Sequence, residues 1–567
     1  MFSKSVLDKN KVLEERWAEN CIELYGDKEF KTVTDSGIEL KPVYTAADIE
    51  GIEYEDIGLP GEHPFTRGCR PLQYQAEGWL VSQLLGYGMG KDGRDRRKLL
   101  EGAGMPRSTV EKWPTRQVLV VDLPTQRGYD PDEPAAWGRI GRDGVSIPTI
   151  REMEALFDGI PLEDAETMFV CMNASLPLLA MYIVYAERRG VPQHKLRMRG
   201  HNQLYRWWCD DICFLPRGAM KLIVEQIKHS VEFMPLMRHT SIMGYGFSEG
   251  GATLVQEIAF MLATAIAFTD ECIKVGLEPD DVVPGFYWHC CVGLNLFEEV
   301  AKYRALRRMA AKIFKERFGC KKPESLRIAL TVQSGGSHLP AQEPLNNIMR
   351  NFIMVLAGVL GGVDAISTAG YDEAWCLPSD EAALIALRTQ QIIYHETNIP
   401  AVADPLGGSY YIEWLTNKTE EEAYKLIQKV DEIGYLKYWE EGWFRRELAK
   451  SANERQRKIE KGEKIIVGVN KYRLPREEEP ELRVFKIDPK VDEEAIARVK
   501  KFRAERDSEK AARALAEMRV AAQRLNDGWP SSCGCLMPAM IDAFRADATL
   551  GEVNQVLREV FGYGYVY

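Results

Sequence analysis

Short segments rich in β-branched residues alternate with longer helical patterns between residues 116 and 404, and this alternation restricts the fold more than any other feature. The stretches between the segments include residues 251–275 and 297–318, which are amphipathic and long enough to be crossover helices. Eight strand–helix alternations predict an α/β protein built on a (β/α)8 barrel. The eight expected strands lie at residues 117–123, 167–173, 196–202, 240–246, 285–292, 326–333, 364–368 and 401–404.

The expected strands contain side chains that are unusual for a barrel interior, which Val, Ile and Leu normally fill. These small or polar residues are Ser241, Gly244, Thr331, Gln333, Ser367 and Thr368. If they face inward, the interior is hollow enough to hold a ligand. The alternative is that they face outward or lie beyond the ends of the strands.

Three regions follow from the pattern. Residues 1–65 are expected to form an N-terminal extension that is helical near residues 6–21. Residues 66–410 are expected to form the barrel with its ligand-binding site. Residues 411–567 are expected to be mainly helical and strongly charged. Within this last region Ile496, Val499 and Phe502 recur at helical spacing, which predicts a surface helix with one packed stripe.

Charge and hydropathy exclude several classes of protein. The chain has 84 acidic and 73 basic residues, a net charge of −11, without a local basic face, so nucleic acid is not an expected partner. The longest apolar run, residues 352–363, is shorter than the roughly 20 residues of a membrane span. Residues 1–20 lack the apolar core of a signal peptide, and the cysteines are scattered, so we expect a cytoplasmic location.

Common catalytic motifs are missing from the sequence. Residues 86–91 resemble a phosphate loop but lack its spacing, and there is no Gly-x-Ser-x-Gly and no His-Glu-x-x-His. Neither close cysteine pair has a second pair at zinc-finger spacing, so no protein metal site is expected. A barrel poor in nucleophiles is typical of an enzyme whose cofactor performs the difficult step.

Seven motifs, in the same order along the chain, resemble the methylmalonyl-CoA mutase family. The resemblance extends from about residue 60 to the C-terminus, and it implies an adenosylcobalamin-dependent carbon-skeleton mutase whose (β/α)8 barrel binds the substrate. The motifs are Phe65–Gly68, Asp122–Asp130, Gly244–Glu249, Phe297–Arg308, Tyr371–Ala374, Ala403–Tyr410 and Val467–Tyr472.

The cobalamin-binding module of the family contains an Asp-x-His-x-x-Gly loop whose histidine binds cobalt, and this sequence has no such loop before its end at Tyr567. The resemblance therefore implies a large subunit similar to those of isobutyryl-CoA and 2-hydroxyisobutyryl-CoA mutases. A separate small subunit would hold the corrin and supply the cobalt ligand, in a heterodimer or a heterotetramer.

The resemblance also assigns site residues. Glu249 and Glu373 match glutamates near the adenosyl ribose, whose hydroxyl protons carboxylates can accept. Tyr245 matches the tyrosine between substrate and corrin, and Gln333 matches a glutamine beside the substrate. The positions that would line the corrin are Leu123, Gln126, Gly336 and Ala374.

The sequence departs from the family at positions on the substrate side. Gly246 stands where a histidine normally binds the thioester carbonyl, and Leu84 where a residue discriminates between substrates. The segment that normally holds the carboxylate-binding arginine is Trp207–Ile212, which contains two aspartates and no basic residue. Methylmalonyl-CoA is therefore disfavoured, because burying an unpaired carboxylate beside aspartates is unfavourable. Two arginines that contact the CoA tail also differ, as Glu77 and Gly285, and Val120 replaces the aspartate of the 2-hydroxyisobutyryl enzyme.

A bulkier acyl group, aromatic or branched, suits the volume that Leu84 and Gly246 open beside the flat walls of Trp207 and Trp208. Arg238 could hold a substrate carboxylate in a new place. We expect His201 to take over the hydrogen bond to the thioester carbonyl, and a packed histidine is the alternative. Tyr74 is assigned to the same substrate-binding group.

Three functions remain open from the sequence. The first is a radical mutase subunit that acts on a bulky acyl-CoA of the succinyl or malonyl type. The second is a cobalamin-dependent mutase whose substrate is not a CoA thioester. The third is a non-catalytic scaffold for a corrin-carrying partner, against which Glu249 and Glu373 argue, because a scaffold has no need to hold an adenosyl ribose.

Overall fold

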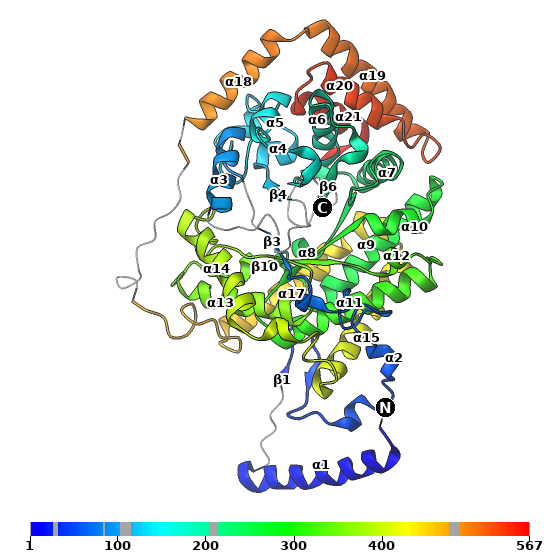
Figure 1. Ribbon diagram of the computed structural model, residues 1–567, viewed down its shortest axis with the longest axis vertical. Helices are drawn as coiled ribbons and strands as arrows, with labels where there is room; N and C mark the ends of the chain where they lie inside the picture. The colour runs from blue at the N-terminus through cyan, green and yellow to red at the C-terminus, as the bar shows by residue number, and fades with distance from the viewer. Residues whose placement is uncertain are drawn as a thin grey trace.

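A computed structural model describes residues 2–26, 32–82, 86–102, 115–202, 212–475, 487–488 and 490–565. Its centre is a (β/α)8 barrel whose parallel strands form two hydrogen-bonded groups in the orders β3-β11-β10-β9-β8 and β4-β5-β6. In Figure 1, β4 and β6 of the second group lie above β3 and β10 of the first. The strands are β3 Leu80–Ser82, β4 Thr115–Val120, β5 Ala165–Val170, β6 Arg197–Arg199, β8 Thr240–Met243, β9 Phe286–Val292, β10 Leu330–Ser334 and β11 Ala365–Ser367.

Short contacts join the two groups of strands into a ring. On one side a parallel bridge links Arg199 of β6 to Arg238, two residues before β8. On the other side the chain that follows β3 meets the end of β4: Met89 is bridged to Ser146, and Val121 to Val145. The Val145 N–H also donates to the carbonyl oxygen of Val120. The prediction of an eight-stranded barrel from the alternating pattern is confirmed.

The prediction of a strand at residues 401–404 is wrong, whereas each of the other seven expected ranges contains a strand; residues 123 and 245–246, expected in strands, belong to helices. Ile399–Ala401 is a 3-10 helix, and Val402 is 59% exposed. Prolines at both sides of this segment remove backbone donors, which disfavours pairing inside a sheet. The eighth strand is β3, which comes first in the chain and pairs with β11 in the register Leu80↔Ala365.

Residues alternate between the two faces of each strand, as the pleat requires. Ile242, Trp288, Val332 and Ile366 belong to the main core between the strands and the surrounding helices. Their neighbours on the opposite face therefore point into the barrel, and these include Ser241, Thr331, Gln333 and Ser367. Of the two alternatives for these side chains, the inward orientation therefore holds for these four. Thr368 lies beyond β11, where its hydroxyl accepts a hydrogen bond from Gln390.

One layer of side chains fills the interior nearer to the amino ends of the strands. Val118 of β4, Met168 of β5 and Tyr287 of β9 form a small buried cluster that is separate from the main core. Beside it, Arg199 forms an ion pair with Glu166 at 2.9 Å, and its guanidinium lies 4.9 Å from the centre of the Tyr287 ring. Open space is therefore found toward the carboxyl ends.

Helices surround the strands, and α9 illustrates why they form. Thr253 and Gln256 build a capping box at its first turn, and nearly every following side chain is buried. Helix α15 covers α9 and α11 from outside. The helices that follow the strands are α3 Gly90–Gly102, α4 Leu123–Arg127, α5 Ile150–Leu156, α6 Ser175–Arg188, α7 Pro216–Phe233, α8 Tyr245–Glu249, α9 Leu254–Lys274, α11 Leu296–Glu316, α13 Asn346–Leu360 and α14 Asp380–Glu396.

Four of the C-terminal helices pack on the half of the barrel that contains β4–β6, at the top of Figure 1. They are α18 Val491–Glu505, α19 Ser508–Asp527, α20 Leu536–Arg545 and α21 Leu550–Phe561. Val499 and Phe502 of α18 are buried, so the predicted packed stripe is confirmed. Asp130, in the loop after α4, accepts hydrogen bonds from the Gly551 N–H at 2.9 Å and from Arg503 at 2.6 Å, which ties these helices to the barrel. The other C-terminal helices pack elsewhere: α15 Tyr410–Ile433 on α9 and α11, α16 Tyr435–Glu440 on α15 and α7, and α17 Trp443–Glu460 on α16.

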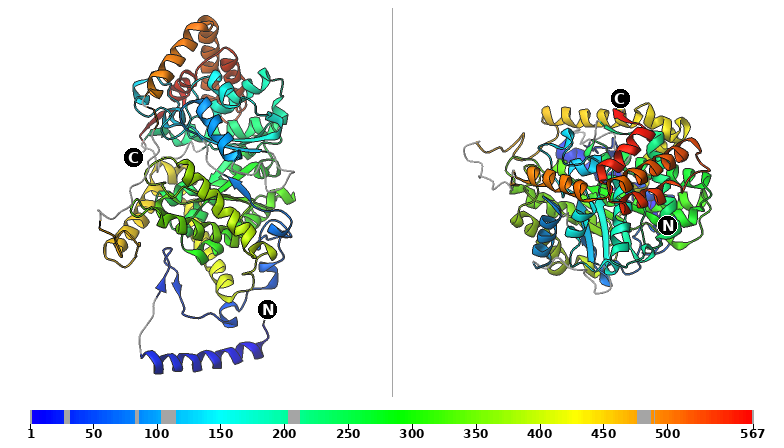
Figure 2. Two further views of the ribbon diagram at one scale, coloured as in Figure 1. Left: turned by 60° about the vertical axis from the view of Figure 1, so that its left-hand side comes forward. Right: turned by 90° about the horizontal axis from the view of Figure 1, so that it is seen from above.

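The N-terminal extension lies at the opposite end of the molecule. Helix α1, Lys4–Tyr25, projects from the body in Figures 1 and 2, and the hairpin of β1 Thr32–Val33 and β2 Glu39–Leu40 follows it. The ring of Phe2 contacts that of Tyr410 with centroids 6.0 Å apart. A short strand, β12 Tyr563–Tyr565, pairs antiparallel with β7 Ile212–Phe214 near the other terminus.

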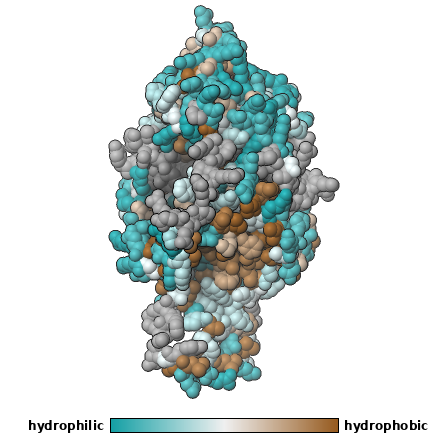
Figure 3. Space-filling model, turned by 90° about the vertical axis from the view of Figure 1, so that its left-hand side faces the viewer, coloured by the Kyte–Doolittle hydropathy of each residue, from teal (hydrophilic) through white to brown (hydrophobic). Residues whose placement is uncertain are grey.

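The longest apolar run of the sequence lies largely within α13. Four of the apolar side chains of this helix region are exposed, at Leu345, Met349, Phe352 and Ile353. Figure 3 shows hydrophobic surface on the side of the molecule on which Figure 1 labels α13. Among the described residues, no helix is both long and apolar enough to cross a membrane.

Candidate active site

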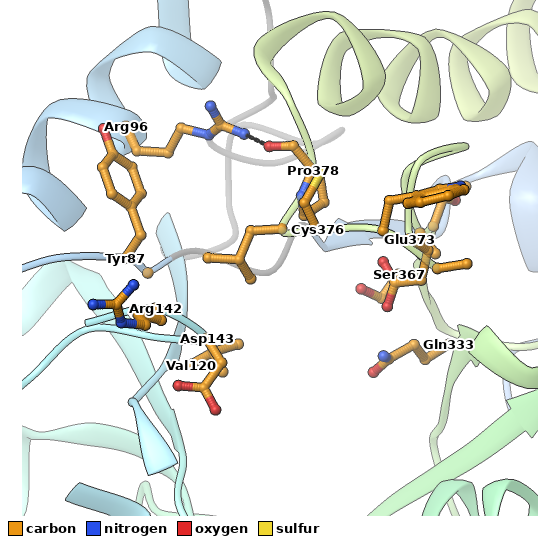
Figure 4. A pocket seen from close by; sticks show the side chains of 16 residues that line it. Tyr87, Arg96, Val120, Arg142, Asp143, Gln333, Ser367, Glu373, Cys376 and Pro378 are labelled. Atoms are coloured by element: carbon orange, nitrogen blue, oxygen red, sulfur yellow. Dashed lines mark hydrogen bonds between the residues drawn. The ribbon is translucent and has the colours of Figure 1, made fainter. Parts of the chain in front are cut away.

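A cavity of about 510 Å³ opens at the carboxyl ends of the strands, where the active sites of (β/α)8 enzymes lie. Figure 4 shows residues that follow β3 and β4 on one side of the cavity and residues of β10, β11 and the next loop on the other. Arg96 of α3 spans the two sides, because its guanidinium donates to the carbonyl oxygen of Pro378. Residues that line the cavity include Tyr87, Val120, Asp143, Gln333, Ser367 and Glu373.

Tyr245 and Glu249 are the first and last residues of α8, a short helix that begins directly after β8. Gly244 makes this sharp transition possible, because a Cβ atom there would lie 2.5 Å from Glu257 Oε1. The helix turns Tyr245 and Glu249 toward the loop after β10.

Glu249 is held in place by that loop. Ser337 donates both its backbone N–H and its hydroxyl to the Glu249 carboxylate, each at 3.0 Å. A Cβ atom on the preceding Gly336 would lie 3.4 Å from Glu249 Oε2, 3.7 Å from the Tyr245 hydroxyl oxygen and 3.8 Å from Glu373 Cγ. The three side chains predicted to surround the adenosyl group and the reacting atoms therefore converge on one glycine.

The electrostatics of this cluster follow from its burial. Burial, together with the neighbouring charges of Asp372 and Glu249, raises the pKa of Glu373 to about 7. Burial and the carboxylates of Glu249 and Glu373 also hold the pKa of Tyr245 well above its usual range. Near neutral pH, Tyr245 is therefore a neutral phenol, and the Glu373 carboxyl group is present in both its protonated and its ionised form.

His289 of β9 is a site residue that the sequence analysis missed. Its ring stacks on that of Tyr245, with centroids 5.9 Å apart, and faces the ring of His201 at 6.5 Å. His201 follows β6 and is 3% exposed, so the structure brings the predicted substrate histidine to the same interior layer as Tyr245. The available signal was the alternation in residues 286–292, which places Tyr287, His289 and Cys291 on the interior face.

The remaining predicted cofactor contacts divide into two groups. Ala374 lines the cavity together with Glu373, and so does Gln333, which was predicted to lie beside the substrate. Leu123 begins α4 at the rim, where its N–H donates to Asp143 at 3.2 Å. Gln126 is 6% exposed, and its amide donates to the carbonyl oxygen of Val121 at 2.6 Å, so it supports the start of α4 from beneath.

Two predicted substrate residues lie away from this cluster. Arg238 precedes β8 and donates to the carbonyl oxygen of Pro284, which precedes β9. The Tyr74 hydroxyl donates to the carbonyl oxygen of Val363, which precedes β11. Both therefore lie at the amino ends of the strands, whereas Tyr245 lies at the carboxyl ends. Leu84, Trp207 and Trp208 lie outside the described residues.

Two carboxylates, a phenol and two imidazoles meet at the carboxyl ends of the barrel strands. This arrangement is typical of a (β/α)8-barrel enzyme whose side chains bind and orient a ligand. The chain belongs to the methylmalonyl-CoA mutase family, whose model matches residues 33–563. The family comprises acyl-CoA mutases, which are isomerases and generally depend on adenosylcobalamin.

Individual relatives cover most of the chain. It is 35% identical to the 2-hydroxyisobutanoyl-CoA mutase large subunit of Aquincola tertiaricarbonis, over 94% of this chain and 92% of the relative. It is 36% identical to the methylmalonyl-CoA mutases of Rhizobium meliloti and Homo sapiens, over 93% of this chain and 72% and 68% of those relatives.

The side chains around Gly336 fit the adenosyl part of that cofactor. Two carboxylates can accept the protons of two ribose hydroxyls, and the glycine between them leaves the space that a side chain would otherwise fill.

Proposed function

We propose that this chain is the large, substrate-binding subunit of an adenosylcobalamin-dependent mutase that rearranges the carbon skeleton of a bulky acyl-CoA. The observation that carries the proposal is the convergence of Glu249, Glu373 and Tyr245 on Gly336. This cluster lies beside the cavity at the open end of the barrel, to which Glu373 and Gln333 both contribute.

Glu249 and Glu373 would hold the adenosyl ribose. Glu249 is fixed by hydrogen bonds from Ser337, and an ionised carboxylate has about four lone-pair sites with which it can accept hydrogen bonds. Glu373, whose pKa is raised to about 7, would lose its proton when a hydroxyl group donates to it. When bound, adenosylcobalamin supplies the radical that begins the rearrangement.

Tyr245, Gln333 and the two histidines would orient the acyl group and exclude water. A neutral phenol and an amide do not take part in proton transfer at neutral pH, so the task of these side chains would be positioning. His201 would donate a hydrogen bond to the thioester carbonyl, since Gly246 supplies no imidazole for this purpose. Such a bond contributes about 0.5–1.5 kcal/mol net.

The proposed substrate has an aryl or a branched alkyl substituent on a succinyl, malonyl or other acyl-CoA, and it is not methylmalonyl-CoA. Gly246 and Leu84 replace larger or polar family residues, and Trp207–Ile212 has no arginine for a methylmalonyl carboxylate. Substrate recognition by volume and flat apolar walls favours large acyl groups.

A small cobalamin-binding subunit is the proposed partner. The relative matched over 92% of its length is named a large subunit. The sequence contains no Asp-x-His-x-x-Gly segment, since none of its eight histidines has an aspartate two residues before it. The cobalt ligand is therefore assigned to the partner.

Electron paramagnetic resonance tests the proposal. The purified chain is mixed with the small subunit, adenosylcobalamin and a panel of acyl-CoA thioesters, frozen during turnover and measured. A cobalt-coupled radical signal with at least one bulky thioester, absent in the Glu249→Ala Glu373→Ala double variant, supports the proposal. Silence with every thioester, while the corrin still binds, favours the scaffold function, and a signal only with acids that lack CoA favours the second alternative.

A further inference from the structure

A buried ionic cluster lies behind the site, between helices α9 and α11. Lys302 of α11 forms ion pairs with Glu257 of α9 at 2.9 Å and with Glu299 at 2.7 Å, and all three side chains are at most 2% exposed. A buried ion pair adds little net stability compared with apolar residues of the same size. The role of this cluster is therefore sought in the hydrogen bonds that it makes to neighbouring elements.

The cluster fixes the carboxyl end of β9. Glu257 Oε1 accepts a hydrogen bond from the Cys291 N–H at 2.8 Å, and Lys302 Nζ donates to the Cys291 carbonyl oxygen at 2.8 Å. Glu299 accepts from the Gly293 N–H, also at 2.8 Å. The backbone N–H and carbonyl of Cys291 are thus held by side chains of opposite charge. Cys291 lies two residues after His289 on the same strand.

The Glu257 carboxylate also contacts α8 and the residue before it. The Ser248 hydroxyl donates to Glu257 Oε2 at 2.9 Å, and Ser248 precedes Glu249. At the start of the helix, Gly244 packs so closely on Glu257 Oε1 that a Cβ atom would lie 2.5 Å away. The Glu257 carboxylate therefore contacts both ends of α8, the helix of Tyr245 and Glu249. The same carboxylate bonds to β9, the strand of His289.

We infer that Glu257 and Lys302 are positioning residues, which set Tyr245 and Glu249 against His289 and Gly336. Neither lines the cavity, so they act through α8 and β9 and not on a substrate. The meaning of this geometry for catalysis rests on the proposed function, whereas the geometry itself can be tested on the free chain.

The test compares Glu257→Gln with Glu413→Gln. Glu413 of α15 is a matched control, because it pairs with Arg304, another buried cation of α11, and also accepts a hydrogen bond from the Gly408 N–H, just before α15. Amide hydrogen exchange is measured over residues 244–250 and 290–294, and global stability by urea unfolding. Ser248→Ala is the second variant, since it removes only the link between Glu257 and α8. Binding of 5′-deoxyadenosine is measured by calorimetry on the same proteins.

We expect Glu257→Gln and Ser248→Ala to raise exchange at residues 244–250 by about tenfold, the effect of losing one buried hydrogen bond. Glu413→Gln should lower global stability without this local change. Two results would overturn the inference. The first is a rise in exchange at residues 244–250 in the Glu413→Gln variant as large as that in Glu257→Gln. The second is wild-type exchange at these residues in both Glu257→Gln and Ser248→Ala. If wild-type protein fails to bind 5′-deoxyadenosine while the exchange results hold, the proposed function fails and the positioning role stands.

Discussion

The ring of Tyr245 stacks on that of His289 with an angle of 28° between the ring planes, and this contact joins α8 to β9 at the site. Tyr245 approaches from the end of β8, while His289 points inward from the next strand. The family resemblance identified only the tyrosine. The histidine gives the phenol a flat surface to rest on.

His289→Ala should lower kcat about tenfold to a hundredfold, because a displacement of about 1 Å of a substrate-orienting group has effects of this size. His289→Phe keeps a flat ring and should retain most of the activity. The rates are measured with the complete enzyme and an acyl-CoA that it rearranges. His229→Ala is the control, since His229 is a buried histidine that bonds Gln193 away from the site. Equal losses in the Ala and Phe variants would show that the stacking has no role.

Glu249→Gln should weaken binding of adenosylcobalamin by the complete enzyme about tenfold or more, because hydrogen bonds to a charged group contribute about 1.5–3 kcal/mol. The change is followed by titration of the corrin absorbance in the visible range. Glu381→Gln, on the exposed surface of α14, should bind as wild type does. Unchanged affinity in Glu249→Gln contradicts the assignment of this carboxylate to the ribose.

The stability of the free chain should fall as the pH rises from about 4.5 to about 7 through the ionisation of Glu373. Its pKa is about 7 in the folded chain against an ordinary value of 4.5, so within this window the folded state holds a proton that the unfolded state has lost. The full difference amounts to roughly 3 kcal/mol. Urea unfolding at several pH values should show a smaller decrease for Glu373→Gln, and parallel curves for the two proteins would be evidence against a protonated Glu373.

Arg199→Met should destabilise the barrel by about 3–5 kcal/mol, the loss expected when one partner of a buried ion pair is removed. Replacing both residues, in Arg199→Met Glu166→Met, should recover most of this loss, since both charges are then removed together. Urea unfolding of the two single variants and the double variant measures the coupling. Additive losses would mean that the two side chains do not interact.

Much of the barrel was predictable because seven strands have an apolar face toward the helices, as in Phe286–Val292. Residues 401–404 were misleading, since their β-branched valine is exposed in a turn between prolines. Leu80–Ser82 has only three residues, too few for a periodic pattern, and its strand conformation depends on pairing with β11.

The candidate site was predictable only in part. Glu249, Glu373 and Tyr245 were recognised through the family motifs, and the structure brings them together around Gly336. His289 matched no such motif, and its position follows from the register of β9 beside β8. Arg238 was expected near the substrate, yet one strand-length along the barrel separates the two ends of β8.

The pairing of Leu80 with Ala365 has a consequence for biosynthesis. While the polypeptide emerges from the ribosome, β3 is made before every other barrel strand, and its neighbour β11 is made after all of them. Until then the backbone groups of β3 have no ladder partner, which is a state that invites association with other chains. Closure of the ring thus depends on a contact of very long sequence separation, which is expected to be slow.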